Sequence, residues 1–278
     1  MILFPHCKIN LGLRVIGKRP DGFHDIETVF YPFPLRDIIE VIKKPQSIPH
    51  SLHSEIEAYY TGLDIPGESE ENICIRAYTL LKKDFPNIGP IELHLHKIIP
   101  IGAGLGGGSS DGAFMLRILN EIFNLQIPKQ ELLKYAAQLG SDCPFFIYDQ
   151  PCFATGRGEV LEPISFDLTS YSMLLVNPNI HVNTAQAFSS LKSFGNGKSI
   201  LSVLKNKVEL WKNDLTNDFE SSVFEKYPAI QNIKQKLYDS GAIYASMTGS
   251  GSSVYGIFPK NQVPNLFENE GYFKKAIL

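Results

Sequence analysis

The stretch "PIGAGLGGGSSDG", from Pro100 to Gly112, places five glycines among residues 102–108 and follows them with two serines. Each glycine costs conformational entropy on folding, so such a run is expected where the backbone turns tightly or another group approaches it closely. A helical pattern, "SDGAFMLRILNEIFNL", begins at its end, with Ser109, Ser110 and Asp111 as candidate N-cap residues. Free backbone N–H groups and the positive end of the helix dipole then converge on the loop. The stretch therefore predicts a phosphate-binding loop.

The same loop contains a literal G-x-G-x-x-G at Gly102, Gly104 and Gly107, the dinucleotide fingerprint. A Rossmann fold needs this motif in the first βα turn, with an acidic residue about 20 positions later at the end of the next strand. Here the motif begins a hundred residues into the chain, and the nearest acidic candidate, Glu121, lies on the polar face of the predicted helix. No G-x-x-x-x-G-K-[ST] occurs either. An NAD site and a Walker A loop are disfavoured, and a glycine-rich turn without a ligand remains as the structural alternative.

The other segments mix strand-like and helix-like patterns without a regular βαβ alternation, which favours an α+β fold. Apolar alternation predicts strands in "KINLGLRVIG", "HDIETVFYPF", "DIIEVI", "IELHLH" and "SMLLVNP", and on both sides of a second small-residue loop in "YASMTGSGSSVYGIF". Helices are predicted over 72–85, capped by Asn72, and in "PKQELLKYAAQLG" and "AIQNIKQKLYDSG". The segment "SDCPFFIYDQPCFATGRGEVLEPI" has the pattern of strands with turns. We place a domain boundary near residue 155, which gives domains 1–155 and 156–278.

The composition argues against several classes of partner. A formal net charge of −3 and a pI near 6.2 provide no electrostatic basis for binding nucleic acid or a membrane surface. No apolar run approaches the ~18 residues of a membrane helix, and the N-terminal "MILFPHCKINLGL" is too short an apolar run for a signal peptide. The four cysteines form no C-x-x-C pair, which is typical of reduced thiols. We therefore expect a cytoplasmic protein with no nucleic acid, membrane or obligatory protein partner.

Two histidines alternate along "IELHLH", so His94 and His96 share one face of the predicted strand. Two histidines at this spacing can contribute to a metal site. No third ligand is suggested nearby, and a solvated strand face is the favoured interpretation. The sequence therefore predicts no metal held by protein side chains.

Three motifs in a fixed order resemble the signatures of one enzyme family. The N-terminal "KINLGLRV", the loop "PIGAGLGGGSSDGA" and the late "MTGSGSSVYGIF" are similar to those of the GHMP kinases (galactokinase, homoserine kinase, mevalonate kinase and phosphomevalonate kinase). Together they span nearly the whole chain. The resemblance implies a two-domain fold, with an N-terminal domain like domain 2 of ribosomal protein S5 and a ferredoxin-like C-terminal domain. It also implies ATP as co-substrate.

Narrower stretches resemble one branch of that family. These are "KINLGLRVIGKRPDGFHDIETVF", "LGSDCPFF" and "TNDFE". The resemblance implies phosphorylation, by ATP, of the 2-hydroxyl of a methylerythritol unit linked to cytidine diphosphate, in non-mevalonate isoprenoid biosynthesis. Its partners would then be two small molecules, ATP and the cytidine diphosphate-linked polyol. Two alternatives stay open: a GHMP kinase acting on mevalonate, homoserine or a sugar, and a non-catalytic nucleotide-binding or regulatory protein of the same fold.

The resemblance implies two catalytic residues. Asp142, in "GSDCPFF", matches the catalytic aspartate of the family, and Lys8, in "CKINLG", matches its lysine partner. A carboxylate can accept the hydroxyl proton as the bond to phosphorus forms. A lysine beside it would stabilise the ionised carboxylate and neutralise charge on the transferring phosphoryl group. Taken without the motif, each would be read as an ordinary surface charge.

The resemblance also implies an ATP site with Mg²⁺ bound to the nucleotide, held largely by phosphate oxygens and water. Asn72 and Lys97 match positions that surround the adenine, and no side chain is assigned to the metal. The phosphate cradle comprises Pro100, Ile101, Gly102, Ala103, Gly104, Leu105, Gly106, Gly107, Gly108, Ser109 and Ser110.

For the cytidine end, Phe23 and His24 in "DGFHD" match an aromatic–histidine pair that stacks on cytosine and reads its polar edge. Phe188 in "NTAQAF" matches the second face of that sandwich, Thr184 a nearby polar contact, and Asn10 a polar residue on the substrate side. The family commonly has tyrosine at the position of Phe23, so a hydroxyl contact is lost here while stacking is retained. "NTAQAF" matches the family pattern only loosely. As a lone aromatic at helical spacing, Phe188 would be read as a core residue.

Overall fold

The structure is a computed structural model that describes residues 1–45, 55–67, 71–191, 194–195 and 197–278. The chain forms two compact units, the first comprising residues 1–7, 34–101 and 106–149, and the second comprising residues 8–33, 102–105 and 150–278. This division differs from the contiguous domains predicted on either side of residue 155. An N-terminal strand pair and four loop residues group with the C-terminal part, which a pattern read along the chain could not reveal.

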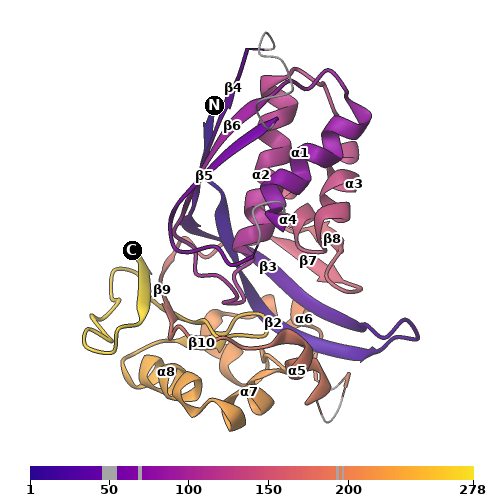
Figure 1. Cartoon of the computed structure of the whole chain (residues 1–278). Helices are drawn as coiled ribbons and strands as arrows, with labels where there is room; N and C mark the ends of the chain where they lie inside the picture. Colours follow the sequence, from indigo (N-terminus) through magenta and orange to yellow (C-terminus); the bar gives the residue numbers. More distant parts are fainter. Residues whose placement is uncertain (46–54, 68–70, 192–193, 196) are drawn as a thin grey trace. The chain divides into compact units, whose positions relative to one another are not determined.

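The first unit contains a four-stranded sheet in the order β1-β4-β6-β5, in which β6 pairs antiparallel with β4 and parallel with β5. Helices α1, α2 and α3 lie on one side of this sheet (Figure 1). The elements are β1 (Ile2–Leu3), β4 (Ile38–Lys43), β5 (Ile56–Gly62), α1 (Ile73–Asp84), β6 (Ile91–Lys97), α2 (Gly107–Ile122), α3 (Lys129–Leu139) and α4 (Cys143–Tyr148).

Local signals account for much of this unit. The Asn72 side chain accepts a hydrogen bond from Cys74 N and caps α1, as its sequence predicts. In β6 the predicted alternation is confirmed, because Ile91, Leu93 and Leu95 are buried. His94, on the opposite face, stacks on a tyrosine of β5 with ring centroids 4.9 Å apart. Within the described ranges no group of three or more His, Cys, Asp or Glu side chains is arranged to hold a metal ion.

Two predictions for this unit are wrong in detail. Helix α2 begins earlier than expected: its N-cap is Gly106, so Ser109, Ser110 and Asp111 lie inside the helix rather than capping it. "CPFFIY" forms the short helix α4 instead of a strand. Pro144 suits a first helical turn, and the aromatic side chains that suggest a strand are buried against α2 and α3.

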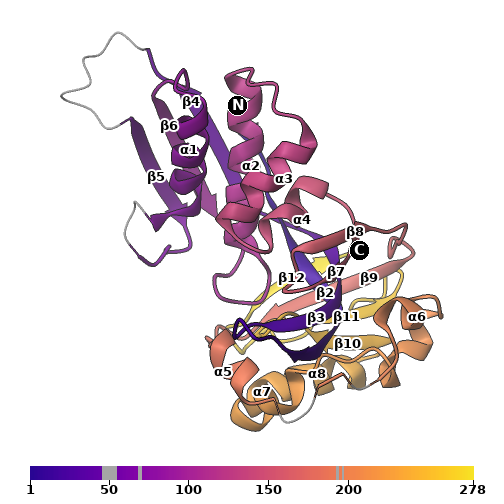
Figure 2. The same ribbon diagram turned by 90° about the vertical axis from the view of Figure 1, so that its right-hand side faces the viewer.

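The second unit contains two four-stranded sheets, β2-β3-β7-β8 and β10-β11-β9-β12. In the latter all pairings are antiparallel, and the connection from β9 to β10 is helical, as in a ferredoxin-like β-α-β-β arrangement. Helix α8 packs on β10 and β11 (Figure 2). The elements are β2 (His6–Lys18), β3 (His24–Arg36), β7 (Cys152–Thr155), β8 (Val160–Pro163), β9 (Tyr171–Asn177), α5 (Thr184–Ser189), α6 (Ile200–Leu204), η2 (Val208–Asn213), α7 (Glu220–Lys226), α8 (Pro228–Asp239), β10 (Tyr244–Met247), β11 (Val254–Pro259) and β12 (Phe273–Ile277).

The predicted α+β class is confirmed by these mixed layers. The four cysteines are buried free thiols. No helix within the described residues has the length and apolar character to cross a membrane.

Candidate active site

The glycine loop has the backbone geometry of an anion cradle. Gly102, Gly104 and Gly106 adopt positive φ angles of 65°, 77° and 69°, so left-handed residues alternate with their neighbours. This alternation turns successive backbone N–H groups toward one side, as in anion-binding nests. Helix α2 starts at the next residue and adds its unsatisfied N–H groups. The loop predicted from sequence therefore has the form that a polyphosphate needs.

The central part of the loop packs on the β10–β11 turn of the second unit. A Cβ at Gly104 would lie 2.2 Å from Thr248 O, so only glycine fits there. Thr248 Oγ1 donates to Gly104 O at 3.3 Å, and Ser253 N donates to Ala103 O at 3.3 Å. Leu105 O accepts a hydrogen bond of 2.9 Å from the backbone N–H of Lys8. The second small-residue loop seen in the sequence thus supports the first.

In the first unit, the end of the cradle that begins α2 is tightly packed at Gly107 and open at Gly108. A Cβ at Gly107 would lie 2.8 Å from Ile99 Cγ2, whereas a Cβ at Gly108 would meet nothing within 4 Å. Ser110 Oγ and Asp111 Oδ1 are buried without a hydrogen-bond partner among the described residues. Buried polar atoms are rarely left unpaired. An oxygen-rich ligand at the start of α2 would account for the Ser110 hydroxyl.

Lys97, which the sequence analysis expected near the adenine, contacts two acidic side chains. Its ammonium group is buried and forms ion pairs with Asp37 and Asp111, with 2.7 Å from Nζ to Asp111 Oδ2. Burial alone would lower the pKa of Lys97, but the two carboxylates outweigh it and raise this pKa. For Asp111, burial outweighs the attraction of Lys97, and its pKa is raised. The Lys97 ammonium thus has two acidic partners, and its place near the adenine stays a prediction. The sequence analysis missed Asp37 because its partners are distant in the chain.

Asp142 occupies the N-cap position of α4 and is half-buried. The next residue, Cys143, has a buried thiol that is hydrogen-bonded by the Ser109 side chain. Burial and the Asp142 charge raise the pKa of this thiol, whereas the Ser109 bond lowers it. The start of α2 and the segment that carries Asp142 are thus in contact within the first unit. Asn72 is half-buried, and its side-chain oxygen is used to cap α1.

Lys8 and Asn10 lie side by side on β2 in the second unit, both buried. Lys8 Nζ donates to Asn10 Oδ1 at 3.1 Å and lies 4.3 Å from the centre of the Phe30 ring. Asn10 in turn donates to Thr28 Oγ1 at 2.9 Å and exchanges hydrogen bonds with Thr248. The lysine predicted to be catalytic is therefore held by a buried polar network.

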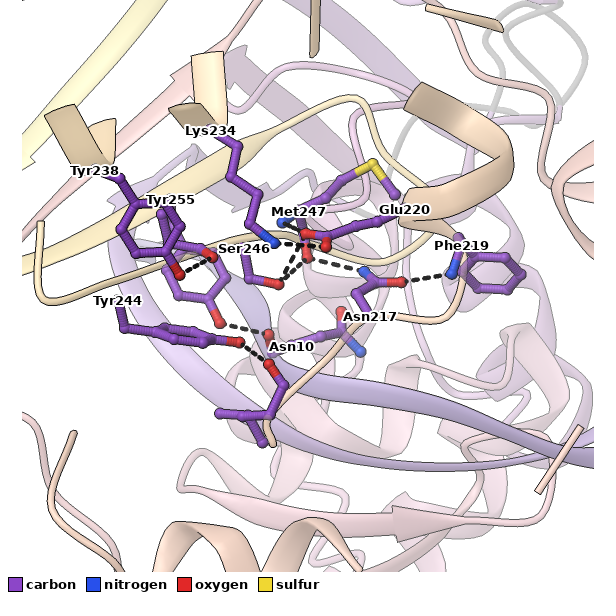
Figure 3. Close-up of polar contacts among 12 residues, drawn as sticks. Asn10, Asn217, Phe219, Glu220, Lys234, Tyr238, Tyr244, Ser246, Met247 and Tyr255 are labelled. Carbon is purple, nitrogen blue, oxygen red and sulfur yellow. Dashed lines mark hydrogen bonds and ion pairs between the residues drawn. The ribbon is translucent and has the colours of Figure 1, made fainter. Parts of the chain in front are cut away.

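Side-chain hydrogen bonds from Asn217 and Glu220 hold the backbone of the β10–β11 turn (Figure 3). Asn217 Nδ2 donates to Met247 O at 2.8 Å and to Gly249 O at 2.9 Å, on either side of Thr248. Glu220 accepts a 2.9 Å bond from Met247 N and pairs with a lysine of α8. The sequence analysis singled out "TNDFE" as a motif but assigned it no role. The structure shows Asn217 and Glu220 supporting the turn that holds Asn10.

Two of the residues predicted for the base are in ring contact in the second unit. His24 stacks on Phe188, with ring centroids 4.7 Å apart and 19° between planes. Burial and the nearby Lys18 lower the pKa of His24. Phe23 is half exposed, and the Arg157 guanidinium lies 4.7 Å from its ring centre, a contact that the sequence did not suggest. The Phe188 face expected for cytosine is thus covered by His24.

Thr184 takes part in a polar contact of its own. It is exposed at the start of α5, where its hydroxyl shares a 2.9 Å hydrogen bond with Ser250 Oγ. Ser250 belongs to the β10–β11 turn. The structure therefore joins Thr184 to the small-residue loop.

Comparison with known proteins agrees with this geometry. Residues 72–150 match the family model described as "GHMP kinases N terminal domain", and residues 198–270 match "GHMP kinases C terminal". The chain is 47% identical over 267 residues to a 4-diphosphocytidyl-2-C-methyl-D-erythritol kinase of Bacteroides fragilis, covering 96% of this chain and 95% of the relative. It is 45% identical over 279 residues to a protein of the same description from Cytophaga hutchinsonii, covering 100% and 99%.

Solved structures give the same picture. A crystal structure of 4-(cytidine 5'-diphospho)-2C-methyl-D-erythritol kinase superposes with a TM-score of 0.79 at 28% identity, covering 92% of this chain and 90% of the other. The mevalonate kinase of Methanococcus jannaschii superposes with a TM-score of 0.67 at 16% identity, covering 99% and 97%. At that identity the second match speaks for the fold alone.

Proposed function

Because the chain belongs to the GHMP kinases and, within them, to the family of 4-diphosphocytidyl-2-C-methyl-D-erythritol kinases, we propose that it phosphorylates that cytidine-linked alcohol with ATP. The reaction transfers the γ-phosphoryl group of ATP to the 2-hydroxyl of the methylerythritol unit, giving the 2-phosphate and ADP. The observation that favours this substrate is the stacked pair of His24 and Phe188, with the exposed ring of Phe23 next to His24 in the chain, in the same unit as Lys8. Mevalonate, homoserine and sugars offer no base for such rings to stack on.

ATP is the co-substrate, and the glycine loop supplies its phosphate site. The left-handed residues at Gly102, Gly104 and Gly106 and the open space above Gly108 suit a polyphosphate that lies along backbone N–H groups. We assign the whole stretch 100–110 to this cradle. Asn72 remains a proposed adenine neighbour, whereas the ammonium of Lys97 is engaged by two carboxylates.

Mg²⁺ would accompany ATP, and when bound it would neutralise charge on the transferring phosphate oxygens. The unpaired hydroxyl of Ser110 is a hard oxygen ligand at the start of α2 and fits that ion. Phosphate oxygens and water would complete its coordination, since the described residues offer no cluster of three ligands of the His, Cys, Asp or Glu type.

The chemical step needs one base and one cation. As the substrate oxygen bonds to the γ-phosphorus and the bond to the bridging oxygen of ADP breaks, Asp142 accepts the hydroxyl proton. Lys8 neutralises the negative charge that spreads over the phosphoryl oxygens. Its hydrogen bond to Asn10 restricts the ammonium, and so lowers the entropy lost on reaching the transition state.

At the cytidine end, Phe23 presents a half-exposed ring for stacking and His24 a ring nitrogen for the polar edge of the base. His24 has a lowered pKa and is neutral near pH 7, so it offers one donor and one acceptor. Stacking between His24 and Phe188 shows that Phe188 has a face that accepts a flat ring. Binding of cytosine on that face requires the His24 ring to move aside. We retain Thr184 and Asn10 as polar contacts of the substrate.

An ADP-release assay on the purified protein tests the proposal, with ATP, Mg²⁺ and each of four acceptors: the cytidine-linked alcohol, mevalonate, homoserine and galactose. Turnover with the first alone is the expected result. Turnover with any of the other three but not the first would overturn the substrate assignment and leave the kinase assignment in place. The reaction takes ATP, and the four cysteines are free thiols, so we also propose the cytoplasm as its compartment.

A further inference from the structure

We propose that Asp37 is a positioning residue for the nucleotide loop, and that it acts through a clamp that includes Lys97 and Asp111. The inference rests on the proposed ATP site. Asp37 immediately precedes β4, is fully buried, and lies outside the motifs singled out in the sequence analysis. Its contacts within the first unit connect the strand that enters the loop with the helix that leaves it.

On the strand side, one carboxylate oxygen holds the chain at the end of β6. Asp37 Oδ1 accepts hydrogen bonds from Ile98 N at 2.5 Å and from Ile99 N at 2.8 Å. These two residues lie between the last residue of β6 and Pro100, where the loop begins. Because neither N–H has a ladder partner beyond the strand, the carboxylate fixes the direction in which the chain enters the loop.

On the helix side, the other oxygen acts through Lys97. Asp37 Oδ2 binds Lys97 Nζ, which also binds Asp111 Oδ2 at 2.7 Å on the first turns of α2. The same ammonium lies 3.1 Å from the position that a Cβ would take at Gly107, the first residue of that helix. The side chains of Asp37, Lys97 and Asp111 are each at most 3% exposed. The start of α2 is therefore held against the end of β6.

This arrangement bears on ATP rather than on the alcohol. A phosphate loop binds through backbone N–H groups, whose directions depend on where its two ends are fixed. A loop with loosened ends must be ordered at the moment of binding, which weakens affinity for the phosphates. The residues proposed for the cytidine end belong to the second unit, whereas Asp37 and its partners belong to the first. Loss of the clamp is thus expected to separate the two substrates.

The test compares Asp37→Ala with Asp37→Asn. Alanine removes both acceptor oxygens, whereas asparagine keeps one for the Ile98 and Ile99 N–H groups. We expect Asp37→Ala to raise the KM for ATP about tenfold or more and to change the KM for the cytidine-linked alcohol by less than about twofold. Asp37→Asn restores most of the ATP KM. Glu40→Ala, on the opposite face of β4, is the matched control and leaves both values unchanged.

Titration calorimetry with ATP keeps the result independent of the alcohol. Inactivity of the wild-type protein toward every alcohol would defeat the proposed substrate, while ATP affinity of the variants would still report on the clamp. Equal increases in both KM values, an unchanged KM for ATP, or no recovery in Asp37→Asn would overturn the positioning role. If Asp37→Ala does not fold, Asp37→Ser takes its place in the comparison with Asp37→Asn. The serine side chain is polar, but it is shorter than aspartate and reaches fewer of the partners of Asp37.

Discussion

Asn10 Oδ1 accepts two hydrogen bonds of 3.1 Å, one from Lys8 Nζ and one from Thr248 Oγ1. This single amide oxygen joins the N-terminal motif to the late small-residue loop, 238 residues further along the chain. The donors of Asn10 are also used, by Thr28 Oγ1 and by Thr248 Oγ1. A fully satisfied buried network of this kind holds one arrangement of its members. The position of the Lys8 ammonium therefore depends on residues from three distant segments.

Removing either proposed catalytic group should abolish most turnover without unfolding the protein. We expect Lys8→Ala and Asp142→Asn each to lower kcat by at least about 10²-fold, because charge neutralisation or proton transfer is lost in the transition state. Steady-state kinetics and circular dichroism measure the two effects. The exposed Lys260→Ala and Asp64→Asn serve as controls and should retain wild-type kcat. Near-normal turnover in Lys8→Ala or Asp142→Asn would remove that residue from the mechanism.

Thr248→Val tests whether the network around Asn10 matters for stability and rate together. Valine has the same shape but leaves Asn10 N unpaired and removes a donor to Gly104 O. Since an unsatisfied buried polar group costs about 1–3 kcal/mol, urea unfolding should show a loss of that size. The kcat should fall about tenfold or more, because Lys8 is then held less firmly. Thr79→Val, at an exposed position of α1, is the control. A loss of stability in Thr248→Val with an unchanged kcat would show that this network does not affect catalysis.

The parts of the fold that were predicted correctly depend on local chemistry. Asn72 caps α1 through its own nearby backbone, and the alternation in β6 needs only the next few residues. Helix α4 was missed because phenylalanine and tyrosine favour strands, and only packing against α2 and α3 outweighs that preference. The pairing of β12 with β9 has no local signal, because the two strands are separated by most of the second unit.

The candidate site divides in the same way. Motif resemblance predicts Lys8, Asp142 and the glycine loop as site residues, because the chemistry of phosphoryl transfer needs these residue types. Asp37 was missed because an isolated aspartate before a strand has no distinguishing pattern, and its partners lie about 60 residues away. Lys97 was assigned to the adenine by resemblance, and the sequence did not suggest the two buried acidic partners of its ammonium. A contact between distant segments cannot be read from either segment alone.

The exposed ring of Phe23 predicts a selective effect on one substrate. Phe23→Ala should raise the KM for the cytidine-linked alcohol about tenfold and leave the KM for ATP unchanged, since stacking on a base contributes roughly 1–3 kcal/mol. Phe23→Tyr should retain the wild-type KM, because the ring is kept. Phe4→Ala is a matched control, as Phe4 is 51% exposed and Phe23 is 53% exposed. An unchanged KM for the alcohol in Phe23→Ala would argue against base stacking at this ring.

The raised pKa of Asp111 predicts how stability depends on pH. Burial is the main cause, and the neighbouring Asp37 charge adds to it, so the folded protein keeps a proton on Asp111 at pH values where the unfolded chain, with a pKa near 4, has lost it. This contribution to stability is fully present below the unfolded pKa and is lost as the pH rises through the folded pKa. Where only the folded state holds the proton, the loss is about 1.4 kcal/mol per pH unit.

Asp111→Asn has no such proton and keeps the Lys97–Asp37 ion pair. The free energy of unfolding of the wild type should therefore fall relative to that of Asp111→Asn between about pH 5 and about pH 8. Urea unfolding of both proteins across this range measures the difference. Asp64→Asn, an exposed change, should run parallel to the wild type. If the unfolding free energy of Asp111→Asn also runs parallel to that of the wild type, Asp111 is ionised throughout this range. The buried set of Asp37, Lys97 and Asp111 then carries one more negative charge than the raised pKa of Asp111 implies.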